Sequence, residues 1–353
     1  MESRRRRAIE IARQAGADAL LAADPATVTW LTGYAADIET GPSPFAHAPL
    51  ALLEAGAAPV LIVSEDEADA AAAGGCEVAT YPGFGLGPID PLGGAARVLS
   101  GLVAGAMIAT EGGALAAALA AGLRTAEVGP DLARARAVKD DDEIDLIRSA
   151  LALCDAGQRA VRRHAQPGMT EIALWALVRT AIEHEAGERV AVLADLVTGP
   201  RTAGVGGAPG ERVLDEGDLV LCDLVPRRFG YWGDSCATFA VGEPSADARS
   251  RHRAAADALQ RAIEALRPGV VAGDLDTLAR TGLEYPHHTG HGLGTTWHEE
   301  PRIVPGSTTV LEPGMVIALE PGSYGGDEGV RVEQVVLVTD GGCEVLSGHE
   351  LAL

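Results

Sequence analysis

Four carboxylates and one imidazole that could together hold metal ions occur in a fixed order in the carboxyl-terminal part of this chain. They are Asp223, Asp234, His291, Glu320 and Glu333. Carboxylate oxygens with a single imidazole suit Mn²⁺, Co²⁺ or Zn²⁺ better than a thiolate-rich set would. Four carboxylates can carry two divalent cations, and if two of them bridge, the cations would lie about 3.5–4 Å apart with a hydroxide between them. These residue types predict a metal-dependent hydrolase.

The surrounding sequence predicts the strands and turns that must position these side chains. Asp223 and Asp234 lie in two apolar runs separated by a turn, which predicts a hairpin with one carboxylate on each strand. Glu320 ends another apolar, strand-like run. Arg331 and Glu333 are two positions apart, so on a strand both side chains would point to one face. A guanidinium there could orient a ligating carboxylate and offset its charge.

Histidines are concentrated around His291. Four of the nine histidines of the chain fall between His287 and His298. A single histidine is more often an ordinary packed or surface side chain, but such clustering indicates a site. His287 and His298 are free to face a substrate while His291 binds metal.

The order and neighbours of these residues resemble the pita-bread metallopeptidases, a family that includes Xaa-Pro dipeptidase (prolidase), aminopeptidase P, methionine aminopeptidase and the metal-free creatinase. In the family pattern, two aspartates eleven residues apart precede a histidine in a Gly-His-Gly context, a glutamate in Glu-Pro-Gly and a glutamate in a Val-Arg-Val-Glu strand. This pattern falls on Asp223, Asp234, His291, Glu320 and Glu333. The resemblance covers nearly the whole chain and implies an α+β protein, with a carboxyl-terminal pita-bread domain and a smaller amino-terminal α/β domain of the creatinase type.

The resemblance also implies a role for each residue. Asp223 would bind one metal ion, His291 and Glu320 the other, and Asp234 and Glu333 would bridge them. Glu320 would in addition relay a proton from the bridging water to the leaving amine. Further candidates are two substrate-facing histidines, the arginine beside Glu333 and an active-site tyrosine: His287, His298, Arg331 and Tyr324. Manganese is the first expectation for the two ions, with cobalt, zinc and iron left open.

Three positions depart from the family pattern. The peptidase members carry a further histidine ahead of the first metal aspartate, and Gly206 occupies that place here. Ala237 stands where the family commonly has an arginine, and Cys236 puts a thiol near the metals. We expect Cys236 to be packing rather than a tuner of metal choice, because free cysteines are often simply buried.

Two functions stay open at this point. The intact ligand set favours an Xaa-Pro dipeptidase or aminopeptidase, in which a metal-bridging hydroxide attacks the bond before proline in a short peptide. Gly206 and Ala237 favour a non-peptidase enzyme on the same fold, creatinase-like or lyase-like, that acts on a small metabolite.

Length and element order predict two domains, residues 1–136 and 137–353, since 353 residues correspond to about two domains. The first domain alternates short apolar runs at 18–22, 59–64, 76–81 and 107–110 with helical stretches, the order of an α/β domain. At the boundary, Asp141 or Asp142 can cap a helix. The apolar stripe expected on that helix is Ile144, Ile147, Leu151 and Cys154.

The net charge and the cysteine content exclude some classes of binding partner and indicate the redox state of the cellular compartment. A net charge of −22 argues against binding nucleic acid or an anionic membrane, which require a basic surface. No apolar run approaches the ~18 residues of a membrane span. Five scattered cysteines without a C-x-x-C pair fit a reduced, cytoplasmic protein.

The family resemblance further implies a homodimer whose loop at 33–47 lies near the pocket of the other subunit.

Overall fold

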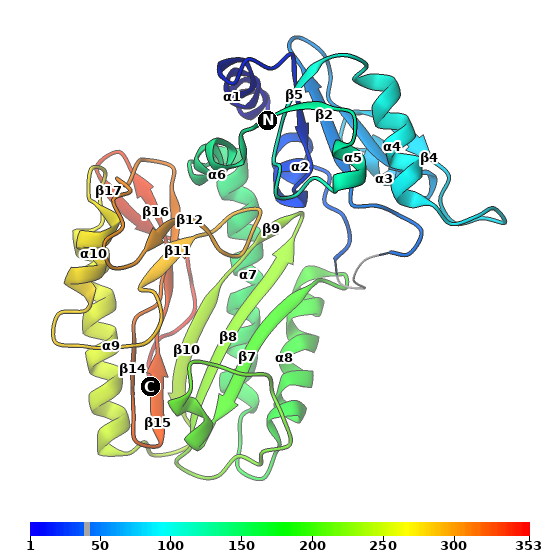
Figure 1. Cartoon of the computed structure of the whole chain (residues 1–353). Helices are drawn as coiled ribbons and strands as arrows, with labels where there is room; N and C mark the ends of the chain where they lie inside the picture. Colours follow the sequence, from blue (N-terminus) through cyan, green and yellow to red (C-terminus); the bar gives the residue numbers. More distant parts are fainter. Residues whose placement is uncertain (39–42) are drawn as a thin grey trace. The chain divides into compact units, whose positions relative to one another are not determined.

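In the computed structural model, residues 1–38 and 43–353 are described, and the chain forms two compact units, Met1–Arg136 and Ala137–Leu353 (Figure 1). The predicted pocket loop at 33–47 includes residues 39–42, which lie outside the described part, so its role stays a prediction. Among the described residues, no helix combines the length and the apolar character needed to cross a bilayer.

The first unit is built on a six-stranded mixed sheet in the order β4-β3-β2-β1-β5-β6. Its strands are β1 (Ala19–Ala22), β2 (Leu50–Glu54), β3 (Val60–Ser64), β4 (Glu77–Tyr81), β5 (Met107–Thr110) and β6 (Arg124–Glu127). The four runs predicted from the sequence are β1, β3, β4 and β5. Two strands were not predicted: the antiparallel β2, although it is a buried apolar run, and β6, a partly exposed edge strand.

Helices cover both faces of this sheet, and a separate apolar cluster lies on each side. The helices are α1 (Glu2–Gln14), α2 (Pro25–Thr32), α3 (Ala68–Ala72), α4 (Pro91–Leu102), α5 (Ala117–Ala120) and α6 (Gly129–Ala137). Trp30 on α2 is fully buried in one of these clusters. Gly33 ends α2 at φ 75°, a left-handed conformation that glycine adopts without steric cost.

The second unit contains two antiparallel sheets and a separate hairpin. The first sheet has the order β10-β8-β7, with β9 paired to β8, and the second has the order β12-β11-β13-β16-β17. The strands of the first sheet are β7 (Val192–Thr198), β8 (Leu219–Arg228), β9 (Tyr231–Trp232) and β10 (Ser235–Ala240). Those of the second are β11 (Gly290–Gly292), β12 (Glu299–Ile303), β13 (Val316–Leu319), β16 (Gln334–Thr339) and β17 (Gly342–Val345), and the hairpin is β14 (Gly322–Gly325) with β15 (Glu328–Arg331).

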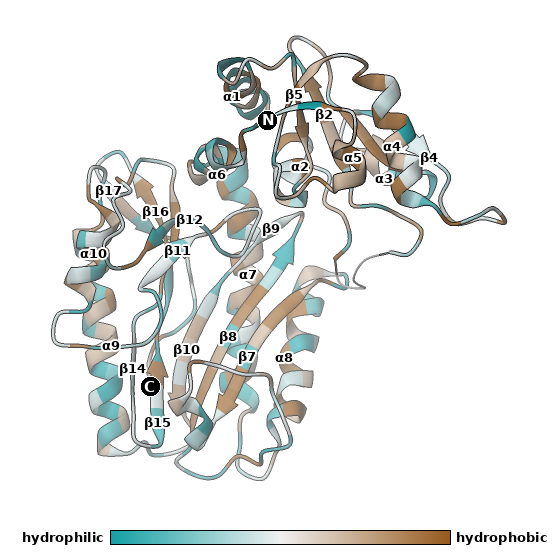
Figure 2. Cartoon of the chain, in the orientation of Figure 1, coloured by the Kyte–Doolittle hydropathy of each residue, from teal (hydrophilic) through white to brown (hydrophobic). Residues whose placement is uncertain are grey.

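Two pairs of helices back these sheets. They are α7 (Asp141–His164), α8 (Glu171–Ala186), α9 (Ala246–Ala265) and α10 (Ala272–Ala279). One apolar cluster joins α7 and α8 to β7 and β8, and another joins α9 and α10 to β13, β15 and β16. Figure 2 shows apolar segments along β7 and β8 and stripes of mixed hydropathy on the helices, as expected for helices that bury one face.

The start of α7 corrects one prediction. Its N-cap is Asp140 rather than Asp141 or Asp142, because Glu143 accepts a hydrogen bond from the Asp140 backbone N–H at 2.9 Å and completes a capping box. The predicted apolar stripe at Ile144, Ile147, Leu151 and Cys154 is confirmed, since all four side chains are buried in one cluster.

Candidate metal centre

The five predicted ligands come from separate elements of the second unit. Asp223 lies within β8, His291 is the middle residue of β11, and Glu320 directly follows β13. Asp234 directly precedes β10, so it lies at the end of a strand rather than within the second strand of the predicted hairpin. Five loci that span more than a hundred residues of sequence, in or beside two different sheets, thus come together at one place.

Glu333 does not share a continuous strand with Arg331, which corrects the predicted geometry. Arg331 ends β15, where it pairs with β14, and Glu333 lies in the link before β16. The chain changes partner here, because the Glu333 backbone N–H donates to the Cys236 carbonyl at 2.9 Å. This contact turns the Glu333 carboxylate toward Asp223 and Asp234.

Side-chain atoms able to bind metal gather in two adjoining groups. Within each group they lie within 4.8 Å of one another: Asp223, Asp234 and Glu333 in one, His288, His291 and His298 in the other. The two groups meet at His291, whose Nε2 lies 3.5 Å from Asp234 Oδ2. Glu320 adjoins the histidine group, since its Oε1 lies 2.6 Å from His288 Nε2 and 3.3 Å from His291 Nε2. A cavity of about 450 Å³ opens onto all of these residues except Glu333, which is buried.

The donor atoms fit divalent cations on three observations. Asp223 Oδ1 and Glu333 Oε1 are buried and accept no hydrogen bond from any described residue. His291 Nδ1 lies 2.9 Å from the Gly292 carbonyl, so Nδ1 must carry the donated hydrogen. Its Nε2 then faces Asp234 Oδ2 at 3.5 Å and Glu320 Oε1 at 3.3 Å. An imidazole nitrogen and carboxylate oxygens that converge in this way require a shared proton or a cation among them.

The pKa shifts of the carboxylates also favour the binding of cations. Burial, reinforced by neighbouring carboxylates, raises the pKa of Asp223 to about 6 against the opposing effect of Arg331. Burial and the charge of its neighbours also raise the pKa of Asp234 and of Glu333 well above the ordinary range. Burial acts in the same direction on Glu320, but hydrogen bonds from His288 and His291 hold the pKa of Glu320 well below its usual value. Cations would relieve the repulsion that raises these values.

Arg331 orients carboxylates, as predicted, although Glu333 is not its main partner. Its Nη2 donates to Asp223 Oδ2 at 2.5 Å, and its Nε lies 3.6 Å from Glu320 Oε2. The guanidinium also donates to the Val205 carbonyl and, at 3.3 Å, to the Cys236 sulfur. The buried Cys236 thus packs in the core and holds Arg331.

The three other predicted residues line or border the same cavity. His287 Nδ1 donates to the His288 carbonyl at 2.8 Å, so its Nε2 accepts from the Tyr324 hydroxyl at 3.0 Å. The His298 ring lies 3.8 Å from the His291 ring, centroid to centroid. Burial lowers the pKa of His287 to about 4, and burial together with His291 and His288 lowers that of His298 to about 4, so both are neutral at neutral pH.

A buried ion pair supports the segment that carries His298. Lys139, just before α7, has a side chain with no exposed surface, and its Nζ lies 2.5 Å from Glu299 Oε1. Thr296 donates to the carbonyl of His298 at 3.0 Å and adjoins Glu299. The helix entry is therefore tied directly to the residue that follows His298.

Two ionisable residues that line the cavity were not assigned from the sequence. His288 belongs to the histidine cluster, and it accepts from Arg302 Nη2 at Nδ1 (2.9 Å) and donates from Nε2 to Glu320. Its position next to His287 was the available signal. Asp195 lies on β7 opposite Asp223 on β8. A lone aspartate in an apolar run gives no signal of a site until the register of those strands is known.

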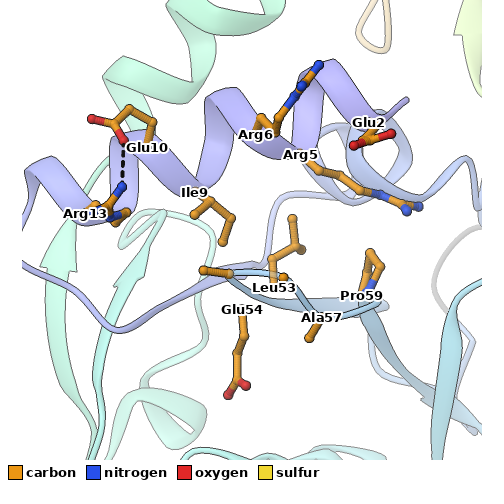
Figure 3. A pocket seen from close by; sticks show the side chains of 12 residues that line it. Glu2, Arg5, Arg6, Ile9, Glu10, Arg13, Leu53, Glu54, Ala57 and Pro59 are labelled. Atoms are coloured by element: carbon orange, nitrogen blue, oxygen red, sulfur yellow. Dashed lines mark hydrogen bonds and ion pairs between the residues drawn. The ribbon is translucent and has the colours of Figure 1, made fainter.

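A second cavity, of about 610 Å³, lies in the first unit between α1 and the β2–β3 turn. Figure 3 shows Ile9 and Leu53 facing its centre and Arg13 joined to Glu10, a pair 3.4 Å apart. Both metal-ligating groups found among the described residues lie in the second unit instead.

Known protein families and relatives match both units of the chain. The family model described as "Metallopeptidase family M24" matches residues 145–340, and the model described as "Creatinase/Prolidase N-terminal domain" matches residues 4–140. The "Probable dipeptidase PepE" of Mycobacterium tuberculosis is 38% identical over 231 residues. That alignment covers 62% of this chain and 61% of the relative, so the match spans about three fifths of the length of such relatives.

Solved structures match over nearly the entire chain. The prolidase from Pyrococcus horikoshii superposes with a TM-score of 0.85 at 25% identity and covers 99% of both chains. Dipeptidase PepE from Mycobacterium ulcerans superposes with a TM-score of 0.80 at 30% identity, covering 100% of this chain and 96% of that one. The predicted fold is confirmed. The non-peptidase alternative is not favoured, because these relatives are named as dipeptidases or prolidases.

Proposed function

The chain belongs to metallopeptidase family M24, and from that premise we propose that it is a dinuclear-metal Xaa-Pro peptidase, most simply a dipeptidase. The convergence of Asp223, Asp234, His291, Glu320 and Glu333 beside one cavity carries the proposal. Buried carboxylate oxygens without a protein partner among the described residues support the binding of cations there.

Asp223, Asp234, His291, Glu320 and Glu333 would together hold a pair of divalent cations, with manganese as the proposed metal. Carboxylates with one imidazole suit such ions. When bound, the ions would supply an activated water and polarise the scissile carbonyl.

The chain's own residues would move the proton and fix the reacting groups. Glu320 is held from two sides, by His288 and His291, so its carboxylate is oriented before substrate enters. That carboxylate would take a proton from water and pass it to the leaving nitrogen. Arg331 would keep Asp223 ionised and in place through their 2.5 Å hydrogen bond.

The neutral histidines His287 and His298 would contact the substrate. His298 lines the cavity and, with its pKa lowered to about 4, can donate an N–H to the carbonyl oxygen without adding a full positive charge. His287 is oriented by Tyr324, which would aim its ring toward the peptide.

Cleavage before proline in a panel of Xaa-Pro dipeptides and Xaa-Pro-Yaa tripeptides, by protein reconstituted with Mn²⁺, tests the proposal. Dipeptides would release free proline, and tripeptides would release the amino-terminal residue and a Pro-Yaa dipeptide. We expect turnover of dipeptides, and a loss of at least about a hundredfold in kcat for Glu320→Gln, the range associated with a positioned acid–base group. The matched control is Glu312→Gln, an exposed glutamate before β13, which should keep full activity. Inactivity of protein that holds two metal ions per chain would refute the peptidase function.

A homodimer is proposed alongside, on the family resemblance. Light scattering that gives the mass of a single chain would refute it.

A further inference from the structure

One wall of the cavity carries a carboxylate outside the set of predicted metal ligands. Asp195 lies on β7 directly opposite Asp223 on β8 and lines the cavity together with Leu193 and Val225. Its side chain is 39% exposed, so a ligand in the cavity can reach it. By contrast, the side chains of Asp234 and Glu320 are at most 9% exposed.

The position of Asp195 depends on the absence of a side chain at Gly206. A Cβ built at Gly206 would lie 1.7 Å from Asp195 Oδ2 and 2.5 Å from its Cγ. The backbone of Gly206 is outside the left-handed region, so its conformation does not require glycine. A side chain at this position would instead displace the flexible carboxylate of Asp195. The space beside Gly206 is therefore filled by an acidic group from β7.

Asp195 retains its capacity to bind a ligand. The cationic group beside it is Arg331, whose Nη2 is 3.8 Å from Asp195 Oδ2, beyond a normal hydrogen bond. That guanidinium is already bonded to Asp223 and to the Val205 carbonyl. No hydrogen bond to the Asp195 carboxylate occurs within residues 1–38 and 43–353.

Asp195 is a fifth carboxylate beside the four of Asp223, Asp234, Glu320 and Glu333. The nearby Arg331 is hydrogen-bonded to Asp223 rather than to Asp195. An exposed carboxylate beyond this set attracts cationic groups and repels anionic ones, most strongly in a cavity partly shielded from water.

We propose that Asp195, in the space left by Gly206, selects substrates whose side chain carries a positively charged group, an ammonium or a guanidinium, on the β7 side of the cavity. The inference rests on the proposed function for the reaction itself. It deepens that function by naming a charge that the substrate must present.

Binding of three probes to Mn²⁺-loaded protein, measured by calorimetry, tests this selection. The probes are N-aminopropyl, N-butyl and N-carboxyethyl pyrrolidone, which share one small amide ring and differ only in a cationic, neutral or anionic arm. None contains an Xaa-Pro bond. We expect the cationic probe to bind about tenfold or more tightly than the neutral one, in the range of one charge-assisted hydrogen bond, and the anionic probe to bind most weakly.

Two variants reach Asp195 by different routes. Asp195→Asn removes the charge and keeps the shape, whereas Gly206→Ala keeps the charge and displaces the carboxylate. Each should bring the ratio of cationic to neutral affinity to about one, and the double variant should show no further loss, because the two changes act on one interaction. Asp215→Asn, at an exposed aspartate of the same unit, should leave the ratio unchanged. Metal content is measured in every variant, so that lost metal is not mistaken for lost selectivity.

The outcomes separate this inference from the peptidase function. If wild type shows no preference for the cationic probe, or Asp195→Asn keeps that preference with metal intact, the inference is overturned even where proline is released. If the preference depends on Asp195 but no Xaa-Pro peptide is cleaved, the selection stands and the proposed reaction is the part that fails.

Discussion

Replacing Lys139 with methionine should destabilise the second unit more than any exposed charge change. The Lys139 side chain is fully buried and that of Glu299 is 5% exposed, with 2.5 Å between Nζ and Oε1. Lys139→Met removes the cation and leaves the Glu299 carboxylate buried without it, which costs about 3–5 kcal/mol in comparable cases. At about 2–4 °C per kcal/mol for a unit of this size, the unfolding midpoint should fall by roughly 6–20 °C.

Two further variants test whether the loss of stability comes from the unpaired buried carboxylate of Glu299. In the double variant Lys139→Met/Glu299→Gln no charge stays buried, so most of the lost stability should return. Arg148→Met breaks the ion pair with Glu344, whose partners lie 2.8 Å apart and are 41% and 48% exposed, and should cost at most about 1 kcal/mol.

Urea unfolding of chelated protein, followed by tryptophan fluorescence and circular dichroism, measures all four proteins without a contribution from bound metal. The reasoning is refuted if Lys139→Met costs no more than Arg148→Met, or if the double variant is no more stable than Lys139→Met alone. Since Glu299 follows His298, the single variant should also lower kcat for any cleaved peptide.

Two predictions concern the metal centre. Asp234→Asn and Glu333→Gln should each reduce bound metal to at most one ion per chain in elemental analysis; two ions in either variant would contradict bridging by that residue. Mn²⁺ should raise the unfolding temperature more at pH 7 than at pH 5. In chelated protein the pKa of Asp223 is raised to about 6, above its unfolded value of about 3.9, so the folded state binds this proton more tightly. The resulting stability is complete below about pH 4 and is lost as the pH rises through about 6, where cations replace the proton. Equal gains at both pH values would contradict this coupling.

Much of the fold was predictable because its elements are encoded locally. Helix α7 follows from an acidic cap and an apolar stripe, and the capping error of one residue reflects three consecutive aspartates that can each serve. Strands β1, β3, β4 and β5 are apolar runs that the sequence displays directly. Strand β6 is partly exposed at the sheet edge, so no continuous apolar run marks it.

For the candidate site, too, some features could be predicted from the sequence and others could not. The sequence by itself determined which residues could bind metal, because Asp223, Asp234, His291, Glu320 and Glu333 carry suitable donor atoms in motifs that resemble a known family. It also placed Gly206 and Cys236 near them.

Only the tertiary structure decided how those side chains are used. The turn of Glu333 toward Asp223 depends on a backbone bond to Cys236, almost a hundred residues away. The contact of Asp195 with the space at Gly206 depends on the path of the chain after β7. Such relations follow from strand register and packing between distant segments, and neither residue spacing nor local propensity encodes them.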